Sequence, residues 1–227
     1  MSRENPPATT HPLWNEELDT RPWALTQELQ LAEFGRLLER LRTNDAWAAR
    51  LPVGRVFSRV EELAEVPFTL KDDLRAAQAE VTPDRPLGAF QNAPTRELVQ
   101  VTSSSGTTGA QTFFGLTRND WTRWKDRIGN AYRTAGVGPG EVVALTTGMA
   151  IVAGGLPYAD GIREAGGVLA WIGGQTTPRM AFGMQRLRVS VLVSTASFAT
   201  HFAERTAEEL GVPATDLSVR TIIAGGE

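Results

Sequence analysis

The stretch VTSSSGTTGAQT, residues 101–112, holds nine serine, threonine and glycine residues in twelve positions and follows a short apolar run that begins at Leu98. Gly106 and Gly109 remove side-chain bulk and allow positive φ, so backbone N–H groups can converge on one ligand while the hydroxyls add further donors. Convergent neutral donors suit a polyphosphate. The stretch is not a Walker A loop, because it contains no Gly-Lys-Ser/Thr. Composition alone also fits a flexible Ser/Gly linker, which the preceding apolar run disfavours.

From residue 97 onward, short apolar runs alternate with helical patterns. The pattern predicts strands at 98–101, 142–145, 168–172, 191–194 and 219–223, and helices at 119–135, 155–165, 178–187 and 197–210. We therefore predict an α/β fold with a mostly parallel sheet and helices on both faces. Ligands of such sheets bind beyond the carboxyl ends of strands, and we expect residues 102–112 to lie at that edge.

The N-terminal part of the chain has a different texture. Residues 1–25 are polar and Pro-rich and predict an irregular arm, and residues 26–96 predict a helical region that precedes the α/β subdomain at 97–227. Leucines at helical spacing predict a helix over 26–41. Thr69 with Asp72 three residues on predicts the start of a second helix that ends near Ala79.

Composition excludes several classes of function. The formal charge is -3 and the basic residues form no run, which argues against nucleic acid as a partner. The chain has no cysteine and only two histidines far apart, so it predicts no disulfide and gives little for zinc. No apolar run reaches membrane-spanning length. We expect a cytoplasmic protein that binds small molecules and not membranes, and we assign His201 no catalytic role.

Residues 104–109, SSGTTG, are similar to the phosphate-loop signature of the adenylate-forming superfamily of acyl-CoA synthetases, adenylation domains and luciferases. The surroundings resemble, more narrowly, the phenylacetate-CoA ligase family. Five further stretches occur in that family's order: VPFTLKDDLR at 66–75, TRND at 117–120, GGL at 154–156, GGQT at 173–176 and AGGE at 224–227. The resemblance runs from about residue 26 to the last residue.

This resemblance implies a reaction in which a small aryl or related carboxylic acid attacks ATP to give an acyl-adenylate, which CoA then converts to a thioester. ATP, Mg²⁺ and CoA are the cofactors it implies, and a homodimer is the assembly it suggests. By motif position, the implied phosphate contacts are Ser104, Ser105, Gly106, Thr107, Thr108 and Gly109. The segment implied to lie along the adenine is Gly225, Gly226 and Glu227.

The acid-binding segment departs from the family's pattern. The family carries an aromatic run where this chain has residues 147–155, and the pocket residues implied here are Thr147, Gly148, Met149, Ala150 and Gly154. The loss of aromatic rings predicts a wider or more aliphatic pocket. Ordinary core packing is an equally supported interpretation of Met149 and Ile151.

Two further departures concern activity. Ala110 and Gln111 replace the family's Lys-Pro, which removes a cation near the phosphates and weakens triphosphate binding by on the order of 1 kcal/mol. The chain also stops at Glu227, before the family's magnesium-binding acid, ribose-binding Asp and lysine-bearing small domain. We therefore expect the N-terminal part of a longer ligase, an incomplete large domain that is inactive alone and to which we assign no catalytic or metal-ligating residue. A catalytically silent nucleotide- or acyl-binding module acting with a partner, and a purely structural domain, are the alternatives.

Overall fold

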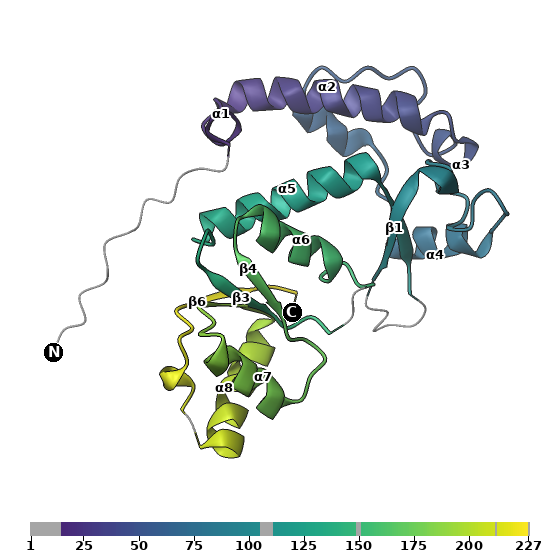
Figure 1. Cartoon of the computed structure of the whole chain (residues 1–227). Helices are drawn as coiled ribbons and strands as arrows, with labels where there is room; N and C mark the ends of the chain where they lie inside the picture. The colour runs from purple at the N-terminus through teal and green to yellow at the C-terminus, as the bar shows by residue number, and fades with distance from the viewer. Residues whose placement is uncertain (1–14, 105–110, 149–150, 212, 227) are drawn as a thin grey trace. The chain divides into compact units, whose positions relative to one another are not determined.

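The structure is a computed structural model, and it describes residues 15–104, 111–148, 151–211 and 213–226 (Figure 1). The chain forms two compact units, and the boundary between them falls after Trp121. We call Glu16–Trp121 the hairpin unit and Thr122–Glu227 the sheet unit, and we describe each by itself. The domain boundaries expected at residues 26 and 97 remain predictions.

The hairpin unit is mostly helical and ends in two short strands. Its elements are α1 Glu16–Asp19, α2 Trp23–Leu41, α3 Asp45–Ala48, the 3-10 helix η1 Val60–Glu65, α4 Lys71–Ala79, the 3-10 helix η2 Thr95–Glu97, β1 Leu98–Ser103 and β2 Phe113–Thr117. The predicted helix over 26–41 is confirmed and begins three residues earlier, directly after Pro22.

A buried asparagine organises the turn from α2 into α3. The side chain of Asn44 accepts a hydrogen bond from the Ala46 amide at 3.0 Å and so caps α3. Its amide group donates to the carbonyls of Ala89 and Gln91, and the neighbouring Trp47 stacks on Phe90 with ring centroids 4.4 Å apart. These contacts tie segments more than 40 residues apart, so this unit depends on polar as well as apolar packing.

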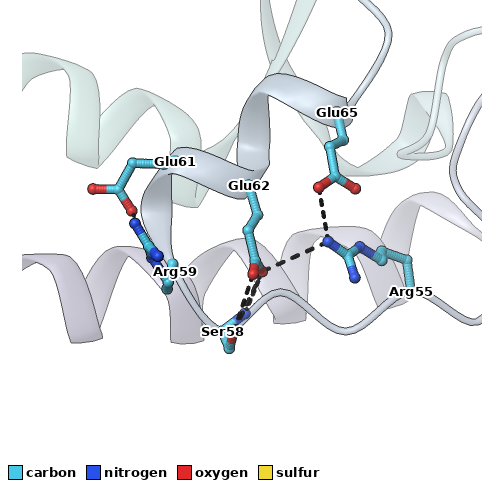
Figure 2. Close-up of polar contacts among 6 residues, drawn as sticks. All are labelled: Arg55, Ser58, Arg59, Glu61, Glu62 and Glu65. Carbon is cyan, nitrogen blue, oxygen red and sulfur yellow. Dashed lines mark hydrogen bonds and ion pairs between the residues drawn. The ribbon is translucent and has the colours of Figure 1, made fainter.

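The segment that leads into η1 is held by ion pairs on the surface (Figure 2). Arg55 lies between two carboxylates of η1, 2.8 Å from Glu65 and 3.9 Å from Glu62, and Glu62 accepts a hydrogen bond from the Ser58 amide at 2.9 Å. That backbone hydrogen bond is the main reason why the pKa of Glu62 lies below its usual range. Because each of these carboxylates has a partner, we interpret the cluster as structural.

The start of α4 corrects one predicted detail. The residue before the helix is Leu70, and its backbone amide donates to Asp73 at 2.8 Å. The predicted pair of Thr69 and Asp72 is therefore one residue out of register, and Asp72 instead pairs with Arg75 at 3.0 Å. The signal of a carboxylate near a helix start was right, because an acid in the first turn serves an orphan N–H from several positions.

The strand at Leu98 does not belong to the parallel sheet, which corrects a central prediction. β1 pairs antiparallel with β2, and the pair forms a separate two-stranded sheet. The hydroxyl-rich stretch therefore connects the two strands of a hairpin, and the strand that precedes it is not a strand of the parallel sheet. β2 was not predicted, because its five residues run directly into the helix α5 Arg118–Thr134 with no turn signal between them.

The sheet unit carries four parallel strands in the order β4-β3-β5-β6. Its elements after α5 are β3 Val142–Leu145, α6 Leu156–Glu164, β4 Val168–Trp171, α7 Thr177–Arg186, β5 Val191–Ser194, α8 Ala196–Leu210, the 3-10 helix η3 Ala214–Asp216 and β6 Thr221–Ala224. The chain continues from β3 to β4 at one edge of the sheet and from β5 to β6 at the opposite edge. The strand order therefore reverses between β3 and β5. The predicted α/β fold with a parallel sheet is confirmed here.

Alternate residues of the central strands build a core on each face of the sheet. Helices α5 and α6 lie on one side of this sheet, and α7 and α8 lie on the other (Figure 1). Val143 and Leu145 of β3 pack with residues of α5 and α6, whereas Ala144 packs with residues of α7 and α8. β5 alternates in the same way, with Leu192 on the α7 side. Burial on both faces explains why these strands are apolar throughout, as the sequence indicated.

Candidate functional site

Only some of the predicted site residues can be placed. Ser104, Thr147, Gly148, Gly154, Gly225 and Gly226 lie in the described part of the chain. The others lie outside the described residues: Ser105, Gly106, Thr107, Thr108, Gly109, Met149, Ala150 and Glu227.

The hydroxyl-rich stretch leaves and re-enters the hairpin unit at one point. The Ser104 amide donates to the Thr112 carbonyl at 2.9 Å, and the Thr112 amide donates to the Ser104 hydroxyl at 3.1 Å. Ser103 and Thr112 are fully buried, and within the described part of the chain their hydroxyls have no hydrogen-bond partner. A buried hydroxyl without a partner costs about 1–3 kcal/mol. The base of the stretch therefore holds unused donors where a polar partner is needed.

A side chain from α4 fixes the returning strand. Gln78 accepts a hydrogen bond from the Phe113 amide at 3.0 Å and donates to the Phe113 carbonyl at 2.6 Å. These two hydrogen bonds to the backbone of Phe113 imitate the pairing of a further strand beside β2. Gln78 was not predicted as a functional residue, because no local motif marks a contact between α4 and a strand 35 residues away.

In the sheet unit, the carboxyl edge of the strands forms a second candidate region at the point where the strand order reverses, which is the usual ligand position in such sheets. Thr146 follows β3, and both its amide and its hydroxyl donate to the Val193 carbonyl of β5, at 3.2 and 3.0 Å. The next residue, Thr147, offers its carbonyl to the indole Nε1 of Trp171 at 2.7 Å. The start of the predicted acid-binding segment is therefore anchored to both neighbouring strands.

Glycines allow the backbone after β3 to approach the backbone after β4. A Cβ atom added at Gly173 would lie 2.3 Å from the Thr147 carbonyl oxygen, and one added at Gly148 would lie 3.1 Å from the Gly174 nitrogen. Gly154 closes the same segment, because its added Cβ would lie 3.7 Å from the Thr147 hydroxyl oxygen. The structure thus brings Thr147, Gly148 and Gly154 together. Their role in binding the acid stays a prediction.

The end of β6 presents bare backbone at the same edge. The Gly225 amide donates to the Ser194 carbonyl at 3.3 Å, and Gly226 has a φ of +82°. Added Cβ atoms at these two glycines would meet nothing within 4 Å. This open backbone fits a flat ring laid against it, as the predicted adenine contact requires, and the contact itself stays a prediction.

Charged groups suited to acid–base or metal chemistry are sparse here. Asp160 pairs with Arg163 at 2.9 Å and Glu164 pairs with Lys125, so neither carboxylate is poised for catalysis. His201 is exposed on α8. Over the residues that the structure describes, no three His, Cys, Asp or Glu side chains gather into a group that could hold a metal ion.

Sequence reasoning missed Trp171 and Thr146, which position the segment after β3. Trp171 closes a strand, where an aromatic residue is most simply explained by packing. The usable signal was the Gly173-Gly174 pair directly beyond it, because paired glycines after a strand mark close approach of two backbones. Among the described helices, none combines the length and the apolarity needed to cross a membrane.

No protein-family model matches the chain. In sequence it is similar to the phenylacetate-coenzyme A ligase of Thermus thermophilus, with 30% identity over 222 residues that cover 95% of this chain and 47% of the relative. It is 32% identical over 169 residues to the phenylacetate-coenzyme A ligase of Pseudomonas putida, which covers 74% of this chain and 36% of the relative. The chain thus spans less than half the length of these curated relatives.

Two solved structures of 2-hydroxyisobutyryl-CoA ligase resemble the chain in fold. The open conformation in complex with 2-HIB-AMP and CoA matches with a TM-score of 0.85 and 21% identity, over 99% of this chain and 53% of that chain. The thioesterification state with the same ligands matches with a TM-score of 0.84 and 23% identity, over 99% and 48%. At this identity the likeness shows the fold, and the chain spans about half of each of these structures.

Proposed function

Because the chain belongs to the phenylacetate-CoA ligase family of adenylate-forming enzymes, we propose that it is part of an ATP-dependent ligase that activates an aryl or related small carboxylic acid and transfers it to CoA. The observation that carries the proposal is the similarity to phenylacetate-coenzyme A ligases along 95% of the chain. The glycine-rich carboxyl edge of the sheet unit supports it, since ligands of such sheets bind there.

The reaction follows from the chemistry of the implied substrates. A carboxylate oxygen attacks the α-phosphorus of ATP, the bond to pyrophosphate breaks, and the thiol of CoA then displaces AMP from the acyl carbon. Negative charge gathers on the leaving pyrophosphate, so fixed neutral donors that face it lower the barrier. Ser104 and residues 105–109 would supply these donors, and magnesium, when bound, would share the same charge.

In this proposal two further segments have separate tasks. Gly225, Gly226 and Glu227 lie along the adenine, and Thr147, Gly148, Met149, Ala150 and Gly154 line the acid pocket. Trp171 holds the Thr147 carbonyl and so positions that pocket. A cytoplasmic location and a homodimeric assembly are further parts of the proposal, and they rest on the family relationship.

We expect no turnover from the 227 residues alone, because the chain spans 47% of the length of its Thermus thermophilus relative. Acid-dependent pyrophosphate exchange by the full-length native protein, measured with ATP, magnesium and a panel of carboxylic acids, tests the ligase function. Absence of exchange with every acid would refute it. A thioester product formed by the purified 227-residue chain would refute the expected inactivity.

The second candidate is a catalytically silent nucleotide- or acyl-binding module that acts with a partner. It is favoured by the same short span, and calorimetry with the 227-residue chain addresses the binding step that both candidates share. Gly106→Val should weaken ATP binding much more than AMP binding, because only ATP carries the phosphates that approach this residue. Gly35→Ala is the matched control, since an added Cβ in the middle of α2 meets nothing within 4 Å. Equal losses for ATP and AMP would refute a phosphate role for the stretch.

A further inference from the structure

The outward face of α7 combines arginines with an exposed aromatic ring. Arg179, Phe182 and Arg186 are spaced by three and four residues, so they form one stripe along the helix. The opposite face, with Met180, Ala181 and Met184, is buried against the sheet. Phe182 is 66% exposed, which is unusual for a large apolar side chain on a short helix whose other face already packs in a core.

The charge of this region differs from that of the whole chain. Residues 165–203 contain no aspartate or glutamate, although the chain has a net charge of -3. In the part of the chain that the structure describes, Arg179, Arg186 and the following Arg188 form no ion pair. The neighbouring helix α8 carries acids only from Glu204 onward, and its Glu208 is already paired with Arg205. The face is therefore positive, and among the described residues of the sheet unit no carboxylate pairs with its arginines.

The end of α7 retains an arginine where backbone geometry favours glycine. Arg188 has a φ of +50° and is the one left-handed residue other than glycine among the described residues. It follows the last turn in a Schellman motif, with the Val189 amide donating to the Met184 carbonyl at 2.9 Å. The helices α5 and α6 end in the same motif with Gly136 and Gly166 at this position.

An arginine at such a position is strained, since the left-handed conformation crowds its Cβ. Backbone strain that glycine would relieve favours a functional role for the side chain of Arg188. The role that fits its surroundings is charge, because Arg188 adds a third arginine two residues after Arg186. The exposed ring of Phe182 is thus flanked along α7 by Arg179 and Arg186, and Arg188 follows at the end of the helix.

We propose that the stripe of Arg179, Phe182 and Arg186, together with Arg188, docks an acidic amphipathic helix of a partner protein. The stripe from Arg179 to Arg186 covers about 10 Å at 1.5 Å per residue, which matches two turns of a facing helix. Such a helix would lay an apolar residue against Phe182 and place carboxylates opposite the arginines. The proposal is independent of the ligase function and stands or falls separately.

The probe is a fluorescein-labelled helical peptide with leucines on one face and glutamates beside them, titrated with the 227-residue chain and followed by anisotropy. The charge control is the same peptide with lysine in place of glutamate. We expect the acidic peptide to bind and to weaken as salt is raised. The double variant Arg179→Glu/Arg186→Glu should raise its Kd at least about tenfold, and Phe182→Ser should raise it several-fold. Arg127→Glu, an exposed arginine of α5 on the other side of the sheet, should leave it unchanged.

Arg188→Gly separates binding from folding. It should raise the melting temperature, because glycine adopts the left-handed conformation without crowding, and at the same time weaken peptide binding. A general folding defect cannot produce that combination. The proposal is overturned if both peptides bind equally, if charge reversal on α7 has no more effect than Arg127→Glu, or if Arg188→Gly binds as well as the parent. It is also overturned if free CoA competes for the face, or if the unmodified chain self-associates through it in sedimentation runs.

Discussion

Replacing Gly173 with alanine should disturb the candidate acid-binding segment through a single added carbon. The added Cβ would lie 2.3 Å from the Thr147 carbonyl oxygen and 2.4 Å from the Thr146 carbonyl oxygen. Real Cβ contacts essentially never fall below 3.0 Å, so the Thr147 carbonyl must move by about 0.7 Å. That oxygen is also the acceptor for Trp171 at 2.7 Å, and its movement stretches this hydrogen bond.

The two effects together set the magnitude. Overpacking against backbone costs about 1–3 kcal/mol, and loss of the hydrogen bond accounts for roughly 1 kcal/mol of it. We expect Gly173→Ala to lower the free energy of unfolding by about 2 kcal/mol and the melting temperature by roughly 4–8 °C, measured by circular dichroism in urea and on heating. Gly225→Ala at the same edge is the control, because its added Cβ meets nothing within 4 Å.

A double-mutant cycle shows whether the two effects share one carbonyl. Trp171→Phe alone should cost about 1 kcal/mol, and it should cost clearly less in the Gly173→Ala background, where the bond is already stretched. Gly173→Ala as stable as Gly225→Ala would refute the close approach of the two segments. Strictly additive losses would refute the shared role of the Thr147 carbonyl.

Three further predictions concern packing and titration. Gly161→Ala should lower the free energy of unfolding by about 1–3 kcal/mol, because its Cβ would lie 2.3 Å from the Ile128 side chain, whereas Gly183→Ala, in open space on α7, should raise it by up to about 1 kcal/mol in urea titrations. Burial raises the pKa of Tyr132 in the folded state, so the free energy of unfolding falls as the pH rises above about 10 and the unfolded state ionises first. Tyr132→Phe should remove this alkaline loss. It should leave the free energy of unfolding at neutral pH equal or higher, because the buried Tyr132 hydroxyl has no partner among the described residues. The hydrogen bond from the Leu70 backbone amide lowers the pKa of Asp73 in the folded state. The ionised Asp73 therefore stabilises the fold above the usual aspartate pKa, and this stabilisation is lost as the pH falls through the lower folded pKa. In melting curves between about pH 5 and 2, Asp73→Asn should reduce the fall of the melting temperature with decreasing pH.

The sheet unit was predictable because its strands are buried on both faces. The apolar runs at β3 and β5 match the predicted bounds, and β4 and β6 differ by one to two residues at their ends. Periodicity reports burial directly, and a strand covered on both faces has little freedom to be anything but apolar. The edge strand β6 was the least well placed of the four, and its Ile222 is 56% exposed.

The β1–β2 hairpin was not predictable by the same reasoning. Val99 and Val101 of β1 are 44% and 39% exposed, so the apolar run at 98–101 did not signal two-sided burial. Its partner β2 is paired by backbone hydrogen bonds and by Gln78 of α4, and neither contact leaves a local sequence pattern. Pairing across the nine residues between Ser103 and Phe113 depends on tertiary context, which a short window cannot contain.

That error separates two arguments that had pointed to the same function. The stretch at 101–112 was assigned to phosphate because of its composition and because it was expected to follow a strand of the parallel sheet, whereas the strand before it belongs to the β1–β2 hairpin. What convergent N–H donors require is backbone freedom at the glycines and anchored ends, and Ser104 with Thr112 supplies the anchor within a hairpin. The carboxyl edge of the sheet unit carries the segments that contain Thr147, Gly148 and Gly225, the predicted contacts for acid and adenine. Variants of these residues should therefore affect acid or AMP binding, whereas variants of residues 105–109 should affect ATP alone, and a residue that altered both equally would contradict this division of tasks.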